Sequence, residues 1–178
     1  MKLKLFIFSV LLAGFLAAEN PAALISTKDL LSLKVWSVEG GAKVEIDEKE
    51  KTIKLLIPAE AKNAPVILEV KKITKEPWWG YNTLKMDLNN STKSKVTLRF
   101  RLVRRALDDL LLQAEHPRYD KDVVLEPGNN SLEIDVTEAG NNPSREIMVE
   151  QLKLIFSNGE KAAQSFVLSK FLLEQTEE

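Results

Sequence analysis

The sequence contains no cysteine among its 178 residues. It can therefore form no disulfide bond, and it offers neither a thiol nucleophile nor a lipid-modified cysteine after a signal sequence. Its single histidine, His116, excludes zinc sites built from clustered histidines and cysteines. A Gly-rich phosphate-binding loop is also absent from the sequence. Stability must come from buried apolar side chains or from a bound ion.

Charge and composition narrow the class of protein further. The chain carries 25 basic and 26 acidic residues, and 44% of its residues are hydrophobic. This fraction is sufficient for a full core, and the length fits one domain. A slightly acidic surface of mixed charge gives no reason to expect a nucleic-acid partner.

The first 18 residues have the pattern of a secretory signal peptide. Lys2 and Lys4 precede an apolar run at 5–16, and the small residues Ala17 and Ala18 follow it. The run is shorter than the roughly 18 residues needed to cross a bilayer, so we expect no membrane span after removal of the signal. We expect a secreted or periplasmic protein with a leader at 19–34, a domain at 35–174 and a tail at 175–178.

Alternation of apolar and polar residues predicts about eight or nine short strands and no parallel sheet. The clearest is the segment 95–103, where every second residue is apolar. We expect 83–88 and 95–103, joined by an Asn-Asn-Ser turn, to be neighbours in one antiparallel sheet. At 104–117 a short helix or turn is slightly favoured over an edge strand. The segments with the clearest pattern are 42–47, 52–57, 66–70, 83–88, 95–103, 132–136, 152–156 and 166–173.

The alternation also predicts which side chains lie between two sheets. Each of these apolar residues has polar neighbours on both sides or occupies every second position of its strand. The predicted core residues are Leu98, Phe100, Leu132, Ile134, Leu152, Leu154 and Phe156.

The segment 79–90, with Trp79, Tyr81, Leu84, Asp87 and Asn90, resembles the W-x-x-Y-x-x-L-x-F-D-x-x-N strand of galactose-binding-like β-sandwiches. Such domains occur as carbohydrate-binding modules in secreted bacterial glycoside hydrolases. The resemblance covers roughly residues 35–174. It implies an all-β, antiparallel jelly-roll sandwich, and it says little about the ligand, because a fold does not fix a function.

One position departs from this family's pattern. The last strand usually carries an Asp near a structural calcium ion, but Ser169 stands there in this sequence, and Lys170 follows it. A hydroxyl is a poor replacement for a carboxylate on a hard cation, and the ammonium group repels one. We therefore predict no metal site and no cofactor.

Nothing in the sequence indicates catalysis. His116 has no evident partner for general-base chemistry. The acidic pairs Asp108-Asp109 and Glu133/Asp135 could in principle serve glycoside hydrolysis, but such pairs are common on solvated surfaces. We expect a protein that is not an enzyme.

The candidate ligand-binding residues are of two kinds. Large aromatic rings can stack on the C–H faces of sugars, and the family resemblance makes Trp79 and Tyr81 structural, which leaves Trp78 as the more exposed ring. Polar side chains of the central strands can bind sugar hydroxyls. Buried tryptophans and a sheet face with cross-strand ion pairs are the alternatives. The predicted site combines Trp78 and Tyr81 at a rim with Lys85, Asp87, Arg99 and Arg101 on the adjoining sheet face.

The resemblance and these residues favour a secreted, non-catalytic β-sandwich that binds a polysaccharide or other glycan. The alternative is a structural or protein-interaction module of a cell envelope or secreted assembly, with an envelope protein as its partner.

Overall fold

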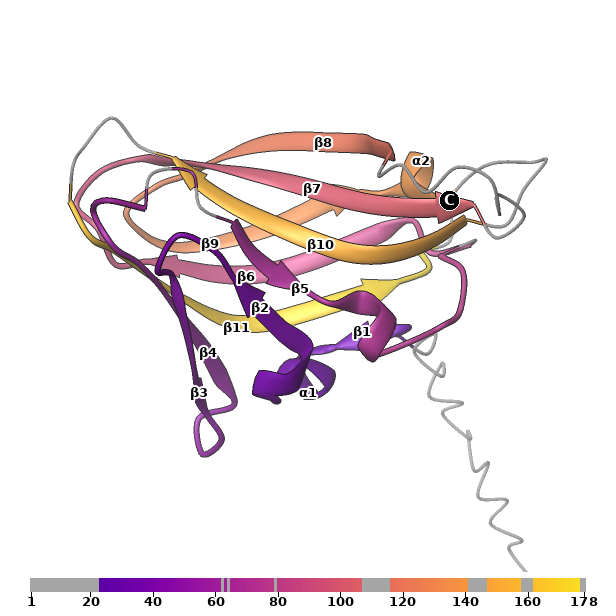
Figure 1. Ribbon diagram of the computed structural model, residues 1–178, viewed down its shortest axis with the longest axis horizontal. Helices are drawn as coiled ribbons and strands as arrows, with labels where there is room; N and C mark the ends of the chain where they lie inside the picture. Colours follow the sequence, from indigo (N-terminus) through magenta and orange to yellow (C-terminus); the bar gives the residue numbers. More distant parts are fainter. Residues whose placement is uncertain are drawn as a thin grey trace, which may run out of the picture.

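A computed structural model describes residues 23–176, except 62, 64, 79, 107–115, 141–146 and 158–161. The predicted signal peptide, residues 1–18, lies outside the described residues. The described part is an antiparallel β-sandwich of two sheets packed face to face (Figure 1). Its eleven strands confirm the all-β fold class, with more strands than the eight or nine expected.

Sheet A, as we call the first sheet, has the strand order β3-β4-β11-β6-β9, and β1 pairs with β11 beside that path. All of its pairings are antiparallel. Its strands are β1 (Ile25–Ser26), β3 (Lys43–Asp47), β4 (Thr52–Ile57), β6 (Thr83–Asn90), β9 (Gly128–Asp135) and β11 (Gln164–Glu174).

Sheet B has the order β2-β5-β10-β7-β8 and is also antiparallel throughout. The predicted strand at 95–103 extends to Ala106, and β8 begins at His116, so both ends of the segment at 104–117 are strand. The middle of that segment lies outside the described residues. The strands are β2 (Trp36–Val38), β5 (Pro65–Leu68), β7 (Val96–Ala106), β8 (His116–Leu125) and β10 (Ile147–Ser157).

Helical structure is limited to single turns in the described part of the chain. These are α1 (Thr27–Leu30), α2 (Thr137–Gly140) and the 3-10 turns η1 (Leu33–Val35) and η2 (Val70–Lys72). The two α-helical turns exceed the one short helix expected from the sequence. None of the helices within the described residues is long and apolar enough to span a bilayer.

The core between the sheets follows the predicted alternation. In β7, Leu98 and Phe100 are fully buried, whereas Arg99 between them is exposed. Six of the seven predicted core residues are buried, and Leu132 is partly buried against the same core. The rings of Phe156 and Phe166 stack across it with centroids 4.0 Å apart. The predicted faces of these strands are confirmed.

The predicted pairing of the segments 83–88 and 95–103 is wrong. Strand β6 belongs to sheet A and β7 to sheet B, so the chain crosses the sandwich between them. Asn90 holds this crossing: its Nδ2 donates to the carbonyl oxygen of Ser94 at 3.0 Å, and its Oδ1 accepts from the backbone N–H of Thr92 at 3.0 Å. A polar turn can connect two neighbouring strands of one sheet or two strands of different sheets. The turn residues determine only the local backbone conformation, and the sheet that the next strand joins depends on long-range contacts.

The residues before position 35 contribute to the sandwich instead of leading into it. Ile25 in β1 pairs with Leu173 in β11 and is fully buried. Thr27 Oγ1 accepts a hydrogen bond from the Phe171 N–H at 2.8 Å. The core packing therefore begins about ten residues before the expected start of the domain.

Candidate functional site

The two predicted arginines lie on the outer face of sheet B. Arg99 makes a bidentate pair with Asp122, with N–O distances of 2.8 and 2.9 Å, and Arg101 makes the same pair with Asp120 at 2.7 and 2.6 Å. Both carboxylates belong to β8, directly across from β7. The arrangement is the cross-strand ion-pair ladder that was the alternative to a sugar-binding face.

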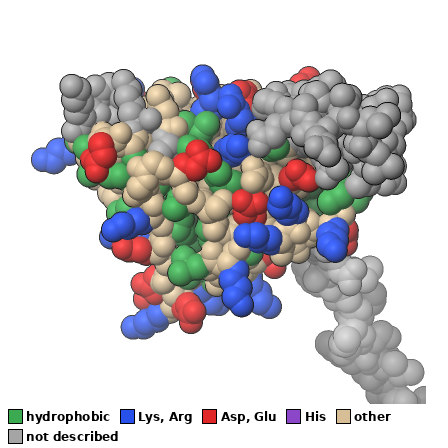
Figure 2. All heavy atoms as spheres, in the orientation of Figure 1, with side chains coloured by type: hydrophobic (Ala, Val, Ile, Leu, Met, Phe, Trp, Pro, Cys, Tyr) green, Lys and Arg blue, Asp and Glu red, His purple; other side chains and the backbone are tan. Residues whose placement is uncertain are grey.

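Sheet B presents a mixed surface on this side. Figure 2 shows basic, acidic and hydrophobic side chains interspersed over the face formed by β5, β7 and β10. Val124 in the edge strand β8 is 58% exposed, whereas Ile67 in β5 is buried. No field of a single sign covers the described part of this face, so the face does not favour a highly charged partner.

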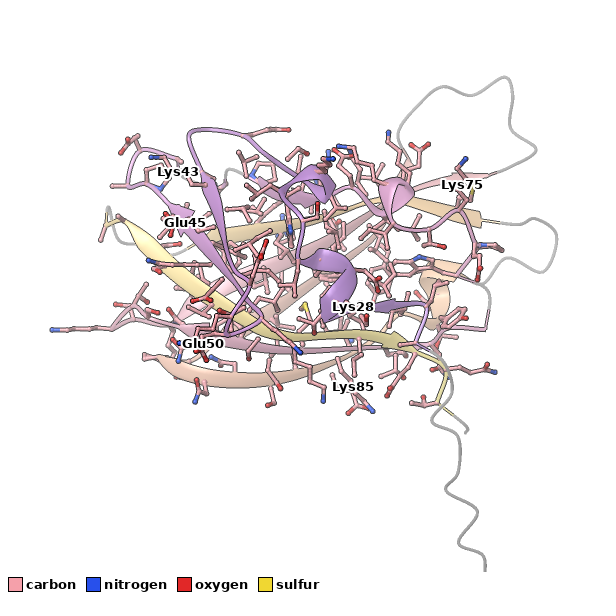
Figure 3. All side chains as sticks on the ribbon, turned by 90° about the horizontal axis from the view of Figure 1, so that it is seen from below. Lys28, Lys43, Glu45, Glu50, Lys75 and Lys85 are labelled. Atoms are coloured by element: carbon pink, nitrogen blue, oxygen red, sulfur yellow. The ribbon has the colours of Figure 1, made fainter. Side chains whose placement is uncertain are left out.

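Lys85 and Asp87 lie on the outer face of sheet A. Figure 3 shows Lys85 at the outer margin of the sandwich on the side of sheet A. Its ammonium group is paired with Glu174, and this hydrogen bond is the first cause of a raised pKa of Lys85. Asp87 Oδ1 accepts a hydrogen bond from Ser131 Oγ in the neighbouring β9 at 2.7 Å.

The single surface predicted for the four polar residues is therefore wrong. Lys85 and Asp87 point away from the sandwich on one side, and Arg99 and Arg101 point away on the other. The error follows directly from the pairing of β6 and β7. Two strands that alternate in the same way present their polar residues on the same surface only if they share a sheet.

Trp78 is not the exposed aromatic that the sequence suggested. It is only 1% exposed and lies in the core, and its Nε1 has no hydrogen-bond partner among the described residues. Tyr81 is partly buried against the same core, and Trp79 lies outside the described residues. The other described aromatic side chains are buried, so the described surface offers no flat stacking platform.

A hollow of about 490 Å³ opens at the end of the sandwich where β6 begins and β9 and β11 end. We call it the end hollow. Figure 1 places the end of β11 and the turn α2 at the same end of the molecule. Hydroxyl, amide, carboxylate and ammonium groups line it, and no apolar residue does so within the described part of the chain. Its lining residues are Asn82, Thr83, Lys121, Glu133, Asp135, Thr137 and Thr176.

A second hollow of about 410 Å³ adjoins the end hollow and shares Lys121 and Asp135 with it. Tyr119 forms part of its wall, and its hydroxyl donates to the backbone carbonyl of Asp135. Burial, followed by the nearby carboxylates of Asp135 and Glu138, raises the pKa of Tyr119 to about 12. The phenol is therefore a neutral structural link between β8 and β9 at neutral pH.

Hydrogen bonds fix the inner wall of the end hollow. Asn82 Oδ1 accepts from the N–H and the hydroxyl of Thr176, both at 2.9 Å, and Thr83 Oγ1 lies 2.8 Å from Thr176 Oγ1. Asp135, which stands opposite Thr83 in the pairing of β6 with β9, accepts at its Oδ1 from the Thr137 N–H at 2.9 Å. Hydrogen bonds from Thr137 are the first cause of a lowered pKa of Asp135. The wall is therefore preorganised, and it carries a carboxylate that stays ionised at neutral pH.

Of the six predicted site residues, Lys85 lies nearest to the end hollow in the sheet, because it stands opposite Glu133 in the pairing of β6 with β9. Tyr81 directly precedes Asn82, and Asp87 is two pairs further along the sheet, on the same face as Lys85. The hollow itself was missed in the sequence. Its lining residues come from four separate segments of the chain. Of these residues, the sequence pattern indicated only Glu133 and Asp135, as an acidic pair.

Ser169, the position where the related pattern has an Asp, lies at an irregularity of β11 between Leu168 and Lys170. Its hydroxyl donates to the carbonyl oxygen of Asp87 at 3.4 Å. In the described residues, no three His, Cys, Asp or Glu side chains are grouped so that they could hold a metal ion. The absence of a calcium site stays a prediction.

The fold has counterparts among solved structures at low sequence identity. A family 11 carbohydrate-binding module from Clostridium thermocellum, solved with a β-1,3-1,4-mixed-linked tetrasaccharide, matches with a TM-score of 0.55 and 12% identity over 84% of this chain and 95% of that chain. An exo-β-agarase matches with a TM-score of 0.56 and 8% identity over 81% of this chain. These likenesses confirm the carbohydrate-binding-module type of β-sandwich as a fold.

The two kinds of counterpart differ in how much of their length is matched. This chain covers 23% of the exo-β-agarase and 24% of a second agarase. The match to the family 11 module, in contrast, covers nearly all of that chain. No protein-family model and no curated protein matches the sequence.

The ion-pair ladder on sheet B predicts a loss of stability in acid. The guanidinium groups of Arg101 and Arg99 lower the pKa of Asp120 and Asp122 below their ordinary values. A carboxylate with a lowered pKa in the folded state stabilises it above the unfolded pKa of about 3.9, and this contribution is lost as the pH falls through the folded pKa. We expect the urea midpoint to fall below about pH 4.

The variant Asp120→Asn/Asp122→Asn isolates this effect. It should lower the urea midpoint at neutral pH and flatten its fall in acid, because neither amide titrates. Measurement of the midpoint from neutral pH to about pH 2.5 tests this. An acid dependence identical in variant and wild type would show that the ladder does not contribute.

Proposed function

We propose that the protein is a non-catalytic, carbohydrate-binding β-sandwich and that the end hollow is its glycan site. The observation that carries the proposal is the lining of the hollow, which offers hydroxyl, amide and charged groups on preorganised walls. Sugars present many hydroxyl groups that both donate and accept hydrogen bonds, so a concave polar site with fixed partners suits them. The shared fold of the family 11 module supports the proposal.

Recognition in this site depends on hydrogen bonds more than on stacking. The described aromatic side chains are buried or partly buried, and the polar groups of β6 and β9 continue from the hollow along sheet A. Lys85 stands beside Glu133 in the sheet and Asp87 two pairs further along, and both extend the proposed surface in this direction. An open polar site must release bound water, so we expect weak affinity, in the micromolar to millimolar range.

Titration calorimetry with a panel of neutral oligosaccharides tests the proposal. Glu133→Ala should weaken binding about fivefold, because it removes one exposed hydrogen-bond acceptor without touching the core. The matched control is Glu50→Ala, in the exposed turn between β3 and β4, which should bind as the wild type does (Figure 3).

Two results would contradict the proposed site. If Arg99→Ala weakens binding and Glu133→Ala does not, the glycan lies on the outer face of sheet B. If no oligosaccharide binds to the folded wild type, the carbohydrate-binding proposal is wrong, and a structural or protein-interaction role in an envelope or secreted assembly becomes the better hypothesis. The secreted location and the signal peptide at 1–18 remain predictions, which N-terminal sequencing of the exported protein tests.

A further inference from the structure

We propose that the end hollow prefers glycans that carry a protonated amino group, and this inference rests on the proposed glycan-binding function. The preference comes from Glu133, a carboxylate at the hollow that pairs with no cation among the described residues. Glu133 is an exposed residue of β9 and lines the hollow. Among the described residues, its side chain makes no hydrogen bond and no ion pair.

The first neighbouring cation is Lys85. It stands opposite Glu133 in the pairing of β6 with β9, which is the position from which a lysine would neutralise it. Its ammonium group is instead paired with Glu174 at the end of β11. The pKa of Lys85 is raised first by the hydrogen bond to Glu174, and Glu133 adds a smaller coulombic contribution.

The second neighbouring cation is Lys121, which lines both hollows. Its charge lies close enough to Asp135 to contribute to the lowered pKa of that carboxyl group, after the hydrogen bonds from Thr137. In the adjoining hollow, Asp120 is already held by Arg101. Lys85 and Arg101 are thus paired with other acids, and within the described residues no cation forms an ion pair with Glu133, whose carboxylate is therefore open to a ligand.

A protonated amine is the sugar substituent that complements such a carboxylate. It presents three N–H donors with a positive charge, and charge-assisted hydrogen bonds are about twice as strong as neutral ones. A sulfate or uronate group in the same place would meet two carboxylates, those of Glu133 and Asp135, and only one ammonium group, that of Lys121, lines the hollow. The hollow should therefore favour amino sugars and disfavour acidic sugars.

The test compares two trisaccharides that differ only in this group: the β-1,4-linked trimer of glucosamine and its fully N-acetylated form. At about pH 5.5 the amines of the glucosamine trimer are protonated. Calorimetric titration of the full chain should show the glucosamine trimer binding about three- to fivefold more tightly, which is the range of a solvent-exposed ion pair. A parallel titration in high salt should reduce the preference.

The substitution Glu133→Gln keeps the size and hydrogen-bonding capacity of the side chain and removes its charge. It should abolish the preference while both trimers still bind. Glu50→Gln makes the same change in net charge in the turn between β3 and β4, and it should leave the preference intact. Thermal unfolding of both variants shows whether they are folded.

Equal affinity of the wild type for both trimers would overturn the inference. An equal loss of preference in Glu133→Gln and Glu50→Gln would also overturn it, because attraction to the overall charge would then suffice. In either case binding of the neutral trimer leaves the proposed glycan site standing. Failure of the wild type to bind any oligosaccharide would refute the glycan site and the amine preference together.

Discussion

Substituting Phe100 with alanine should lower the free energy of unfolding by about 3–5 kcal/mol, the usual cost of removing a buried phenyl ring. Phe100 is fully buried in the middle of β7, opposite Leu154 of β10. Its ring also meets the Tyr119 ring of β8 edge-on, with centroids 6.4 Å apart and an angle of 88° between the planes. The substitution therefore removes contacts among three strands of sheet B and leaves a cavity where the phenyl ring was. This cavity cannot close unless the strands of the sheet move.

Urea unfolding followed by circular dichroism measures this loss. Val124→Ala is the matched control, because Val124 lies in β8 of the same sheet and is 58% exposed. The control should change the free energy of unfolding by no more than about 0.5 kcal/mol. A loss below about 1 kcal/mol for Phe100→Ala would contradict the packing described for this face of β7.

Substituting Trp78 with alanine should destabilise the fold by a similar amount, about 3–5 kcal/mol. The side chain is 1% exposed and is the largest among the fully buried ones. Trp78→Phe should cost much less. The phenyl ring retains most of the apolar contacts, and the substitution removes an indole N–H that has no partner among the described residues.

The same pair of variants separates a core role from a surface role. An aromatic residue that served as a platform for sugars would reduce affinity when removed and leave the urea midpoint unchanged. We expect the opposite order: a large fall of the midpoint for Trp78→Ala and a small one for Trp78→Phe. An unchanged midpoint for Trp78→Ala would show that this residue is not part of the core.

Several features of the fold could be predicted from the amino-acid sequence alone. Alternation in the strands β7, β9 and β10 predicted which side chains point into the core, because successive residues of a strand face opposite sides. The absence of cysteine excluded disulfide bonds as a source of stability. The motif at 79–90 and the spacing of the strands identified the type of sandwich, which the two solved counterparts match at 8% and 12% identity.

The location of the polar side chains relative to one another could not be read in the same way. Alternation states that Lys85 and Arg99 both point outward, and it does not state from which sheet. That depends on the path of the chain after Asn90, which crosses to the other sheet and pairs β7 with β10 and β8. Trp78 was misplaced for another reason: the W-x-x-Y spacing puts the tryptophan three residues before Tyr81, which is Trp78, whereas Trp79 was assigned that place. A residue in a loop also has no strand periodicity to indicate its burial.

The end hollow exists only because the tertiary structure brings its lining residues together. Asn82, Lys121, Glu133 and Thr176 are far apart in the sequence, and no single motif contains them. They meet because β9 pairs with β6, β6 pairs with β11, and Tyr119 of β8 donates to the end of β9. That the Glu133 carboxylate has no cationic partner also depends on contacts between strands. Lys85 pairs with Glu174 of β11, which is its neighbour only in the folded sheet. Local sequence determines the direction of each side chain from its strand, and long-range pairing determines which side chains share a surface.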